Sequence, residues 1–190
     1  YRISAYGPDL SRASTNPADG NPPYFLSVDG IPHQQVWSSE QAAASDLHRQ
    51  AFAWFPDRTF DRVLVIGAGS GTDVALALAN GAKHVTAVEI DPRLAQVGRD
   101  FHPEDVYDDP RVTVVVNDGR AFLNGSREQY DLIVYALTDS LTLVSSTAGV
   151  RLESFLFTEE SLRAAKDHLA PGGMFSMYNL YREPWLVTKL

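Results

Sequence analysis

Short apolar runs alternate with amphipathic segments along the chain from residue 61 onward. Runs of four or five mostly apolar residues are typical of strands that are buried on both faces of a parallel sheet. We expect five such strands, at residues 63–66, 85–88, 112–116, 131–135 and 174–178. Helices are expected between them, over residues 72–80, after the N-cap signal Asp91-Pro92, and over residues 158–169. This order predicts an α/β fold with a Rossmann-like, doubly wound and mostly parallel sheet that carries helices on both faces.

The first 60 residues follow a different pattern. Residues 1–6 alternate in the manner of a strand, and residues 24–28 form a second candidate strand before the tight-turn signal Asp29-Gly30. Residues 7–23 are rich in turn-forming residues and are expected to be a long loop. The chain is therefore predicted to contain an N-terminal β-strand pair, or hairpin (1–37), a linking helix (38–60, helical over 38–55) and a nucleoside-binding Rossmann-like domain (61–190).

A glycine-rich loop directly follows the first buried strand and opens a helix. Glycines are needed where the backbone turns tightly and a ligand approaches without a Cβ in the way. A strand-to-helix turn without a ligand would also fit this loop taken alone. The residues of the loop are Gly67, Ala68, Gly69, Ser70 and Gly71.

Two acids strengthen the case for a nucleoside. Glu89 ends the second strand, 22 residues after Gly67 (89 − 67), which is about where a carboxylate binds ribose hydroxyls in this fold. Ile90 follows it, and the pair Asp118-Gly119 follows the third strand at the same edge of the sheet. Thr72 stands where the dinucleotide fingerprint wants its third glycine. The G-x-G-x-G form resembles S-adenosylmethionine-dependent enzymes more than NAD enzymes.

Composition excludes several classes of function. The 190 residues carry 16 Lys and Arg against 24 Asp and Glu, and this net charge of −8 argues against a nucleic-acid partner. The absence of cysteine excludes a thiolate metal site and a Cys nucleophile, and the five histidines show no metal-ligand spacing, so no metal is predicted. No apolar run approaches 18 residues, and no signal peptide is visible. Because the chain opens on Tyr1 without a Met, we interpret it as a piece of a longer protein.

Several segments resemble the spermidine synthase (polyamine aminopropyltransferase) family, within the wider methyltransferase-like fold. The likeness covers most of residues 24–180, and residues 135–158 resemble a subgroup of synthase-like domains carried on membrane proteins. The resemblance implies a cytoplasmic domain that belongs either to a soluble protein or to one with membrane-spanning segments outside this chain. The matching segments are FLSVDGIPHQ (25–34), VLVIGAGSGTD (63–73), HVTAVEIDP (84–92), DDPRVTVVVNDGRAF (108–122) and YDLIV (130–134).

The resemblance also implies roles for single residues. The glycine loop would shape the nucleoside pocket, Glu89 would hold the ribose, and Asp118 would face the adenine. Ile90 and Gly119, which follow these two acids, would also contact the nucleoside. Gln34 would lie near the tail of the donor. Asp139 would match an acid that binds the amine substrate, and it is the predicted catalytic residue.

Two departures from the family pattern affect the chemistry. The presumed base of the family falls on Ala136, and the acid that binds the aminopropyl group falls on Ser70. Aminopropyl transfer needs a neutral amine, so a base must take a proton from an ammonium group. With Ala136 in place, either Asp139 both binds the amine and takes its proton, or the reaction is a different one. The expected Tyr-His-type gate segment is also not recognisable around residues 46–48.

The leading hypothesis is a transferase that binds S-adenosylmethionine or its decarboxylated form and moves an aminopropyl group to a putrescine-like amine. The alternatives are an S-adenosylmethionine-dependent methyltransferase and a non-catalytic nucleoside or polyamine sensor. Complete methyltransferase-like domains end with two further strands that this chain lacks. The fifth strand would then be an open edge, which predicts a homodimer or a partner segment over residues 174–178.

Overall fold

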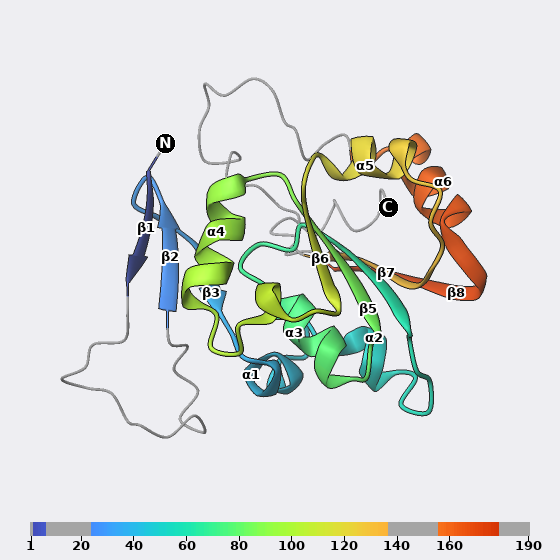
Figure 1. The fold of residues 1–190 in the computed structure, drawn as a ribbon, viewed down its shortest axis with the longest axis horizontal. Helices are drawn as coiled ribbons and strands as arrows, with labels where there is room; N and C mark the ends of the chain where they lie inside the picture. Colours follow the sequence, from blue (N-terminus) through green and yellow to red (C-terminus); the bar gives the residue numbers. More distant parts are fainter. Residues whose placement is uncertain (1, 7–23, 137–155, 179–190) are drawn as a thin grey trace, which may run out of the picture.

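The computed structural model describes residues 2–6, 24–136 and 156–178 (Figure 1). Its centre is a five-stranded sheet of order β6-β5-β4-β7-β8, in which every neighbouring pair is parallel. Within this sheet, the first strand in chain order is the middle strand β4. The next two, β5 and β6, are added on one side of it, and β7 and β8 are then added on the other side. This reversal is the switch point at which open α/β sheets bind ligands. The strands are β4 (Arg62–Ile66), β5 (His84–Glu89), β6 (Val112–Val116), β7 (Tyr130–Ala136) and β8 (Leu169–Tyr178).

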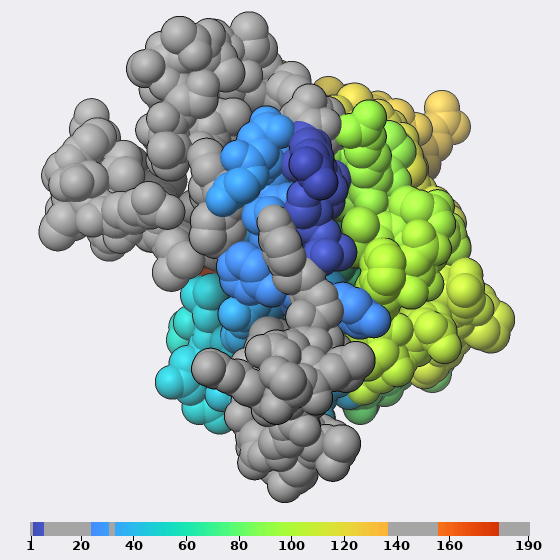
Figure 2. All heavy atoms as spheres, turned by 90° about the vertical axis from the view of Figure 1, so that its left-hand side faces the viewer, coloured from blue at the N-terminus to red at the C-terminus, as the bar shows by residue number. Residues whose placement is uncertain are grey.

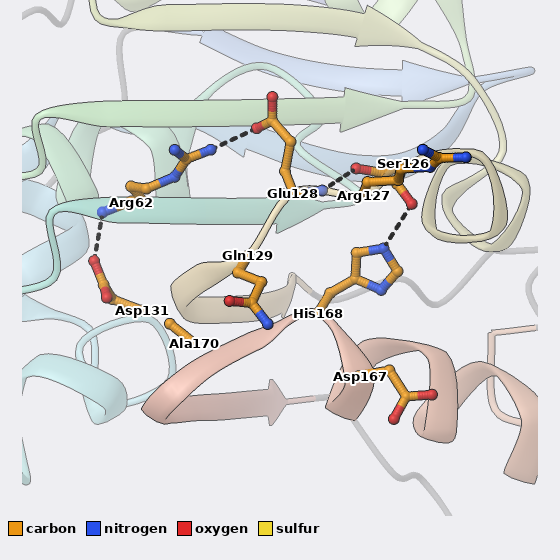
Figure 3. Close-up of a pocket in the computed structure, with 9 residues that line it drawn as sticks. All are labelled: Arg62, Ser126, Arg127, Glu128, Gln129, Asp131, Asp167, His168 and Ala170. Atoms are coloured by element: carbon orange, nitrogen blue, oxygen red, sulfur yellow. Dashed lines mark hydrogen bonds and ion pairs between the residues drawn. The ribbon is translucent and has the colours of Figure 1, made fainter.

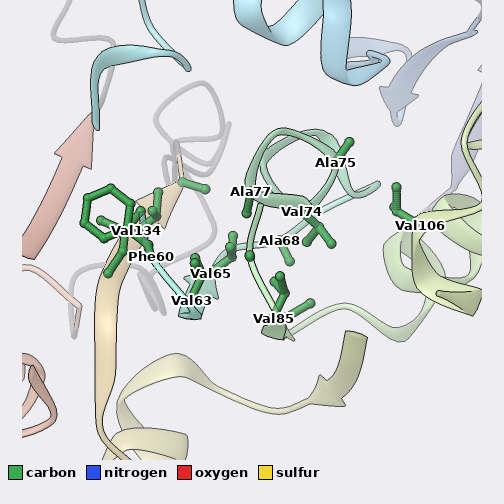
Figure 4. Close-up of a cluster of buried hydrophobic side chains, with 14 of the residues drawn as sticks. Phe60, Val63, Val65, Ala68, Val74, Ala75, Ala77, Val85, Val106 and Val134 are labelled. Carbon is green, nitrogen blue, oxygen red and sulfur yellow. The ribbon is translucent and has the colours of Figure 1, made fainter. Parts of the chain in front are cut away.

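Both faces of the sheet are covered, which explains the apolar runs in the sequence. Val63 and Val65 face a cluster with α3 (Thr72–Ala79) and α4 (Pro92–Phe101), shown in Figure 4. Leu64 and Ile66, the alternate residues of β4, face the cluster with α5 (Gly119–Gly125) and α6 (Glu159–Asp167). The predicted doubly wound fold is therefore confirmed.

Local signals set most of the helix ends. Asp91 caps α4 by accepting from Arg93 N (2.9 Å), and Thr158 caps α6 by accepting from Ser161 N (3.3 Å). The sequence did not predict the helix α5 or the short 3-10 turn η2 (Val106–Asp108). The Pro-Gly-Gly segment at residues 171–173 was expected to precede the fifth strand. It lies inside β8, where the pairing with β7 is irregular.

The N-terminal strands form a separate, smaller sheet. It has three antiparallel strands, where the sequence predicted a pair: β1 (Ile3–Tyr6), β2 (Tyr24–Val28) and β3 (Ile31–Val36). The turn at Asp29-Gly30 is confirmed by positive φ angles at both residues. Leu26 and Val36 pack on Leu94 of α4, and Figure 2 shows this sheet in blue beside the green of α4. The loop predicted for residues 7–23 lies outside the described residues.

The predicted linking helix over residues 38–55 is wrong as a single helix. The structure has two short helices instead, α1 (Ser39–Ala44) and α2 (Gln50–Ala53). The extended backbone of Ser45 ends α1, and the turn that follows carries His48 to Asp73 of α3. No helix within the described ranges is long and apolar enough to cross a bilayer.

Candidate functional site

The glycine loop joins β4 to α3 and is anchored on the neighbouring strand β5. Gly67 N and Ala68 N both donate to Val88 O, at 2.9 and 3.1 Å. Gly71 N donates to Ala68 O (2.9 Å), which closes a tight turn just before α3. Gly69 has a φ of +54°, in the region that favours glycine. The predicted loop therefore lies at the carboxyl end of the central strand, beside the N-terminus of a helix.

Glu89 ends β5, and the backbone holds both of its carboxylate oxygens. Gly69 N donates to Oε2 (2.7 Å), and Asp91 N donates to Oε1 (2.9 Å). Glu89 is only 5% exposed. Burial raises the pKa of Glu89, while the hydrogen bonds from Asp91 and Gly69 act in the opposite direction. The chain itself thus fixes a carboxylate beside the loop, with lone pairs left to accept from ligand hydroxyls.

Gln34 reaches the glycine loop from β3 of the small sheet. Its Oε1 accepts from Ser70 N (3.3 Å) and from Ser70 Oγ (3.2 Å). The approach is close, because a Cβ built on Gly69 would lie 2.6 Å from Gln34 Oε1. An amide and a hydroxyl, both uncharged, therefore meet at the position where the family resemblance placed an acid.

Tyr107 also holds the glycine loop, and the sequence did not predict this contact. It is 3% exposed, and its hydroxyl donates to Gly69 O (2.8 Å). The ring lies against Gly98 of α4, where a Cβ would stand 2.4 Å from Tyr107 Cε2. Burial raises the pKa of Tyr107, with a further contribution from the Glu89 carboxylate, so the phenol stays protonated as a donor. The glycine inside α4 was the one available sequence signal for this contact.

Asp118 follows β6, whose carboxyl end lies at the same edge of the sheet as the carboxyl ends of β4 and β5 (Figure 1). Asp118 caps α5 by accepting from Ala121 N (2.8 Å), and the preceding Asn117 N donates to Glu89 O (3.0 Å). Gly119 is packed so closely that a Cβ there would lie 2.4 Å from Ile66 Cγ2. Ile90 is 46% exposed beside these groups. The structure therefore gathers the predicted glycine loop and both acids at the carboxyl ends of β4, β5 and β6.

Comparison with known proteins identifies the family. A sequence model of the spermine/spermidine synthase domain matches residues 51–190. The chain belongs to this family. The polyamine aminopropyltransferase of Klebsiella pneumoniae (strain 342) is 32% identical over 121 residues, which are 62% of this chain and 39% of that protein. The chain thus spans about two fifths of the length of the curated relatives it matches.

Solved spermidine synthases share the fold of this family member. A spermidine synthase in complex with the transition-state analogue AdoDATO has a TM-score of 0.63 and 22% identity, over 82% of this chain and 50% of that chain. A probable spermidine synthase from Corynebacterium glutamicum ATCC 13032 has a TM-score of 0.63 and 20% identity, over 92% of this chain and 59% of its own. These likenesses agree with the predicted fold class.

This spermidine synthase family member departs from the expected pattern at the acceptor side of the site. Ser70 is fully buried at the foot of the loop, and Ala136, at the end of β7, is 5% exposed. Asp139, the predicted catalytic acid, lies outside the described residues. The described part of the chain therefore has no carboxylate at either of the two positions where the resemblance expects one.

A polar cluster that the sequence did not reveal lies next to Ala136. Tyr178 is the register partner of Ala136 on β8, and its hydroxyl donates to Asp73 Oδ2 (2.6 Å). His48 Nδ1 lies 3.0 Å from the same hydroxyl and 3.4 Å from Asp73 Oδ1. Residues that are far apart in sequence form this cluster, so no spacing rule could find it.

A hollow of about 710 Å³ opens at the opposite edge of the sheet (Figure 3). It lies where β4, β7 and β8 begin, and the ion pair of Arg62 with Glu128 (2.7 Å) joins two of its lining residues. The glycine loop and the predicted acids lie at the other ends of the strands, so this hollow is separate from the candidate site. No three His, Cys, Asp or Glu side chains within the described ranges gather into a metal site. The hollow is lined by Arg62, Ser126, Arg127, Glu128, Gln129, Asp131, Asp167, His168 and Ala170.

Proposed function

We propose that this chain is the donor-binding domain of an aminopropyltransferase. The donor would be decarboxylated S-adenosylmethionine, and the acceptor a small amine of the putrescine type. In this reaction the amine nitrogen attacks the carbon next to the sulfonium, and a neutral thioether leaves. The curated relatives are polyamine aminopropyltransferases, which supports this reaction class for the present chain.

The observation that carries the proposal is the pairing of Glu89 with the glycine loop. A carboxylate whose two oxygens are fixed by Gly69 N and Asp91 N is suited to accept hydrogen bonds from the two hydroxyls of a ribose. Gly69 leaves no side chain between this carboxylate and the approaching ligand. Asp118, one strand further along, would face the base of the nucleoside.

The contact of Ser70 with Gln34 favours a second candidate, an S-adenosylmethionine-dependent methyltransferase. Intact S-adenosylmethionine carries a carboxylate on its tail, and the decarboxylated form does not. An acid at position 70 would repel that carboxylate, whereas the uncharged side chains of Ser70 and Gln34 do not. Methyl transfer also draws much of its rate from positioning, so it does not require paired acids.

Calorimetric titration separates these functions. The protein is titrated with decarboxylated S-adenosylmethionine and, separately, with the intact form, each with and without putrescine. Tighter binding of the decarboxylated form, strengthened by putrescine, supports aminopropyl transfer. Preference for the intact form supports a methyltransferase. Binding of neither form would overturn the proposed nucleoside site.

A further inference from the structure

We propose that His48, oriented by Asp73 and Tyr178, is the proton acceptor for the amine substrate of this site. The inference rests on the proposed aminopropyl transfer and deepens it. It assigns the base that the sequence lacks at Ala136 to a residue outside the sheet.

The position of the cluster is the first argument. Asp73 lies in the first turn of α3, two residues after Gly71 of the glycine loop. Tyr178 ends β8 and is paired with Ala136, the end of β7. The turn between α1 and α2 brings His48 to both of them. The cluster therefore stands at the carboxyl edge of the sheet, beside the position at which the expected base is missing.

Hydrogen bonding in the cluster decides which nitrogen of His48 carries a proton. The single hydroxyl proton of Tyr178 goes to Asp73 Oδ2 at 2.6 Å. Burial raises the pKa of Tyr178, and the Asp73 carboxylate raises it further, so this phenol stays protonated. His48 Nδ1 then faces two acceptors, the Tyr178 oxygen and Asp73 Oδ1. Only a protonated Nδ1 satisfies both.

The lone pair of neutral His48 is consequently on Nε2. Within the described residues no hydrogen bond to Nε2 is found, and the His48 side chain keeps 13% of its exposure. Trp37 packs edge-on against the imidazole, with ring centroids 5.2 Å apart, and Tyr178 does so at 5.3 Å. Two aromatic contacts and the Asp73 carboxylate thus fix the ring, as a base requires an orienting partner.

The charges around His48 are consistent with this role. Asp73 and Tyr178 face it from α3 and β8, and Trp37 contributes no charge. On its own segment, Asp46 and Arg49 pair with each other at the surface. A carboxylate that accepts from Nδ1–H stabilises the imidazolium that forms when Nε2 takes a proton.

The proposed step balances in protons and electrons. A primary ammonium gives one proton to His48 Nε2 and becomes a neutral amine. The nitrogen lone pair then forms a bond to the carbon attached to the sulfonium, and the carbon–sulfur bond breaks with its electron pair going to sulfur. The products are a secondary ammonium and a neutral thioether. His48 returns its proton to solvent.

The test compares variants of the full chain in donor binding and in turnover. For H48A and D73N we expect binding of decarboxylated S-adenosylmethionine within about threefold of wild type and turnover with putrescine lower by about 10²-fold. Added imidazole should restore part of the turnover of H48A, because it can accept the proton in place of the missing ring. H84Q, at an exposed histidine at the start of β5, is the matched control and should turn over normally.

The results distinguish a failure of the proposed function from a failure of the His48 inference alone. A wild-type chain that binds the donor but transfers nothing to any amine overturns the proposed function and this inference together. A wild-type chain that is active, with H48A and D73N equally active, overturns the inference alone. Nitrogen chemical shifts of His48 give a check that holds even if a variant fails to fold, because a neutral ring protonated at Nε2 in the wild type would contradict the assigned tautomer.

Discussion

The phenol of Tyr107 donates a hydrogen bond to the carbonyl of Gly69 over 2.8 Å, across a separation of 38 residues. This bond ties the 3-10 turn η2 to the loop that also bonds Glu89. Two buried side chains therefore hold the glycine loop through Gly69, the Glu89 carboxylate through its N–H and the Tyr107 phenol through its carbonyl.

Replacement of Tyr107 by Phe should weaken both the fold and the donor site. The variant leaves the Gly69 carbonyl without its buried donor, which costs about 1–3 kcal/mol of unfolding free energy. We expect a lower urea midpoint and weaker binding of decarboxylated S-adenosylmethionine. Tyr24, a half-buried tyrosine whose ring packs on Phe101, gives the control Y24F. Equal losses in both variants would contradict a specific role for Tyr107.

Alanine at Gly69 should be more damaging than alanine at Gly81, because the new Cβ displaces the Gln34 side chain from its hydrogen bonds to Ser70. Both Gly69 and Gly81 have positive φ, so G69A and G81A share a backbone cost of about 1–2 kcal/mol. Only at Gly69 does the new Cβ meet an atom, Gln34 Oε1 at 2.6 Å, whereas nothing lies within 4 Å at Gly81. The difference in denaturation midpoint between the two variants measures that contact. Loss of donor binding should accompany G69A and not G81A.

Replacement of Glu89 by Gln should abolish tight donor binding. An amide has one acceptor oxygen, so it cannot accept from both Gly69 N and Asp91 N. The amide also offers one acceptor oxygen in place of two, so one proposed bond from a ribose hydroxyl is lost. A hydrogen bond to a charged group is worth about 1.5–3 kcal/mol, or roughly 10–100-fold in the dissociation constant. E128Q, at an exposed carboxylate of the hollow at the opposite edge, is the control. Calorimetry that finds E89Q and E128Q alike would exclude Glu89 from the site.

The stability of the protein should fall in mild acid because of His102. Burial lowers the pKa of His102 below its usual 6.5 in the folded chain. The unfolded chain therefore binds more protons as the pH falls from about 6.5 toward the lowered value, and the unfolding free energy decreases across that window. Above pH 6.5 this contribution is constant. Urea unfolding between pH 8 and pH 5 should show a slope in wild type that is reduced in H102Q.

We expect the chain to self-associate through β8. In the described part of the structure this strand pairs with β7 on one side only. An open strand edge offers a row of donors and acceptors to a second chain. Light scattering over a range of concentrations checks the prediction, and a monodisperse monomer at high concentration would contradict it.

The strands of the large sheet could be predicted because burial on both faces forces continuous apolar runs. Residues 112–116 were placed at their observed bounds, and Asp91 and Thr158 marked the starts of two helices correctly. Helix α5 was missed because its short sequence begins with Gly119 and ends with Gly125, and carries little periodicity. The linking helix was overextended because apolar spacing continued through Leu47, and the contact of His48 with Asp73 is invisible in sequence.

The candidate site also contains some residues that the sequence predicted and others that it could not. The glycine loop and the two acids lie directly after strands, so their order in the sequence fixes their common edge in the fold. Tyr107 acts through one long-range hydrogen bond and Tyr178 through two, and such contacts leave no periodic trace in the sequence. The contact of Gln34 with Ser70 joins β3 of the small sheet to the glycine loop. The family resemblance placed Gln34 near the tail of the donor, and it did not predict this contact.

The bond between His48 and Tyr178 links positions 130 residues apart, and that between Asp73 and Tyr178 links positions 105 apart. We expect contacts of such long range to form late in folding, because distant segments must first be brought together at an entropic cost. The loop at β4, by contrast, needs only β5 beside it to acquire its anchor at Val88. A chain that has not yet docked β8 would thus already hold the proposed donor-binding loop without the proposed base. If both proposals hold, donor affinity is acquired earlier in folding than the capacity for transfer.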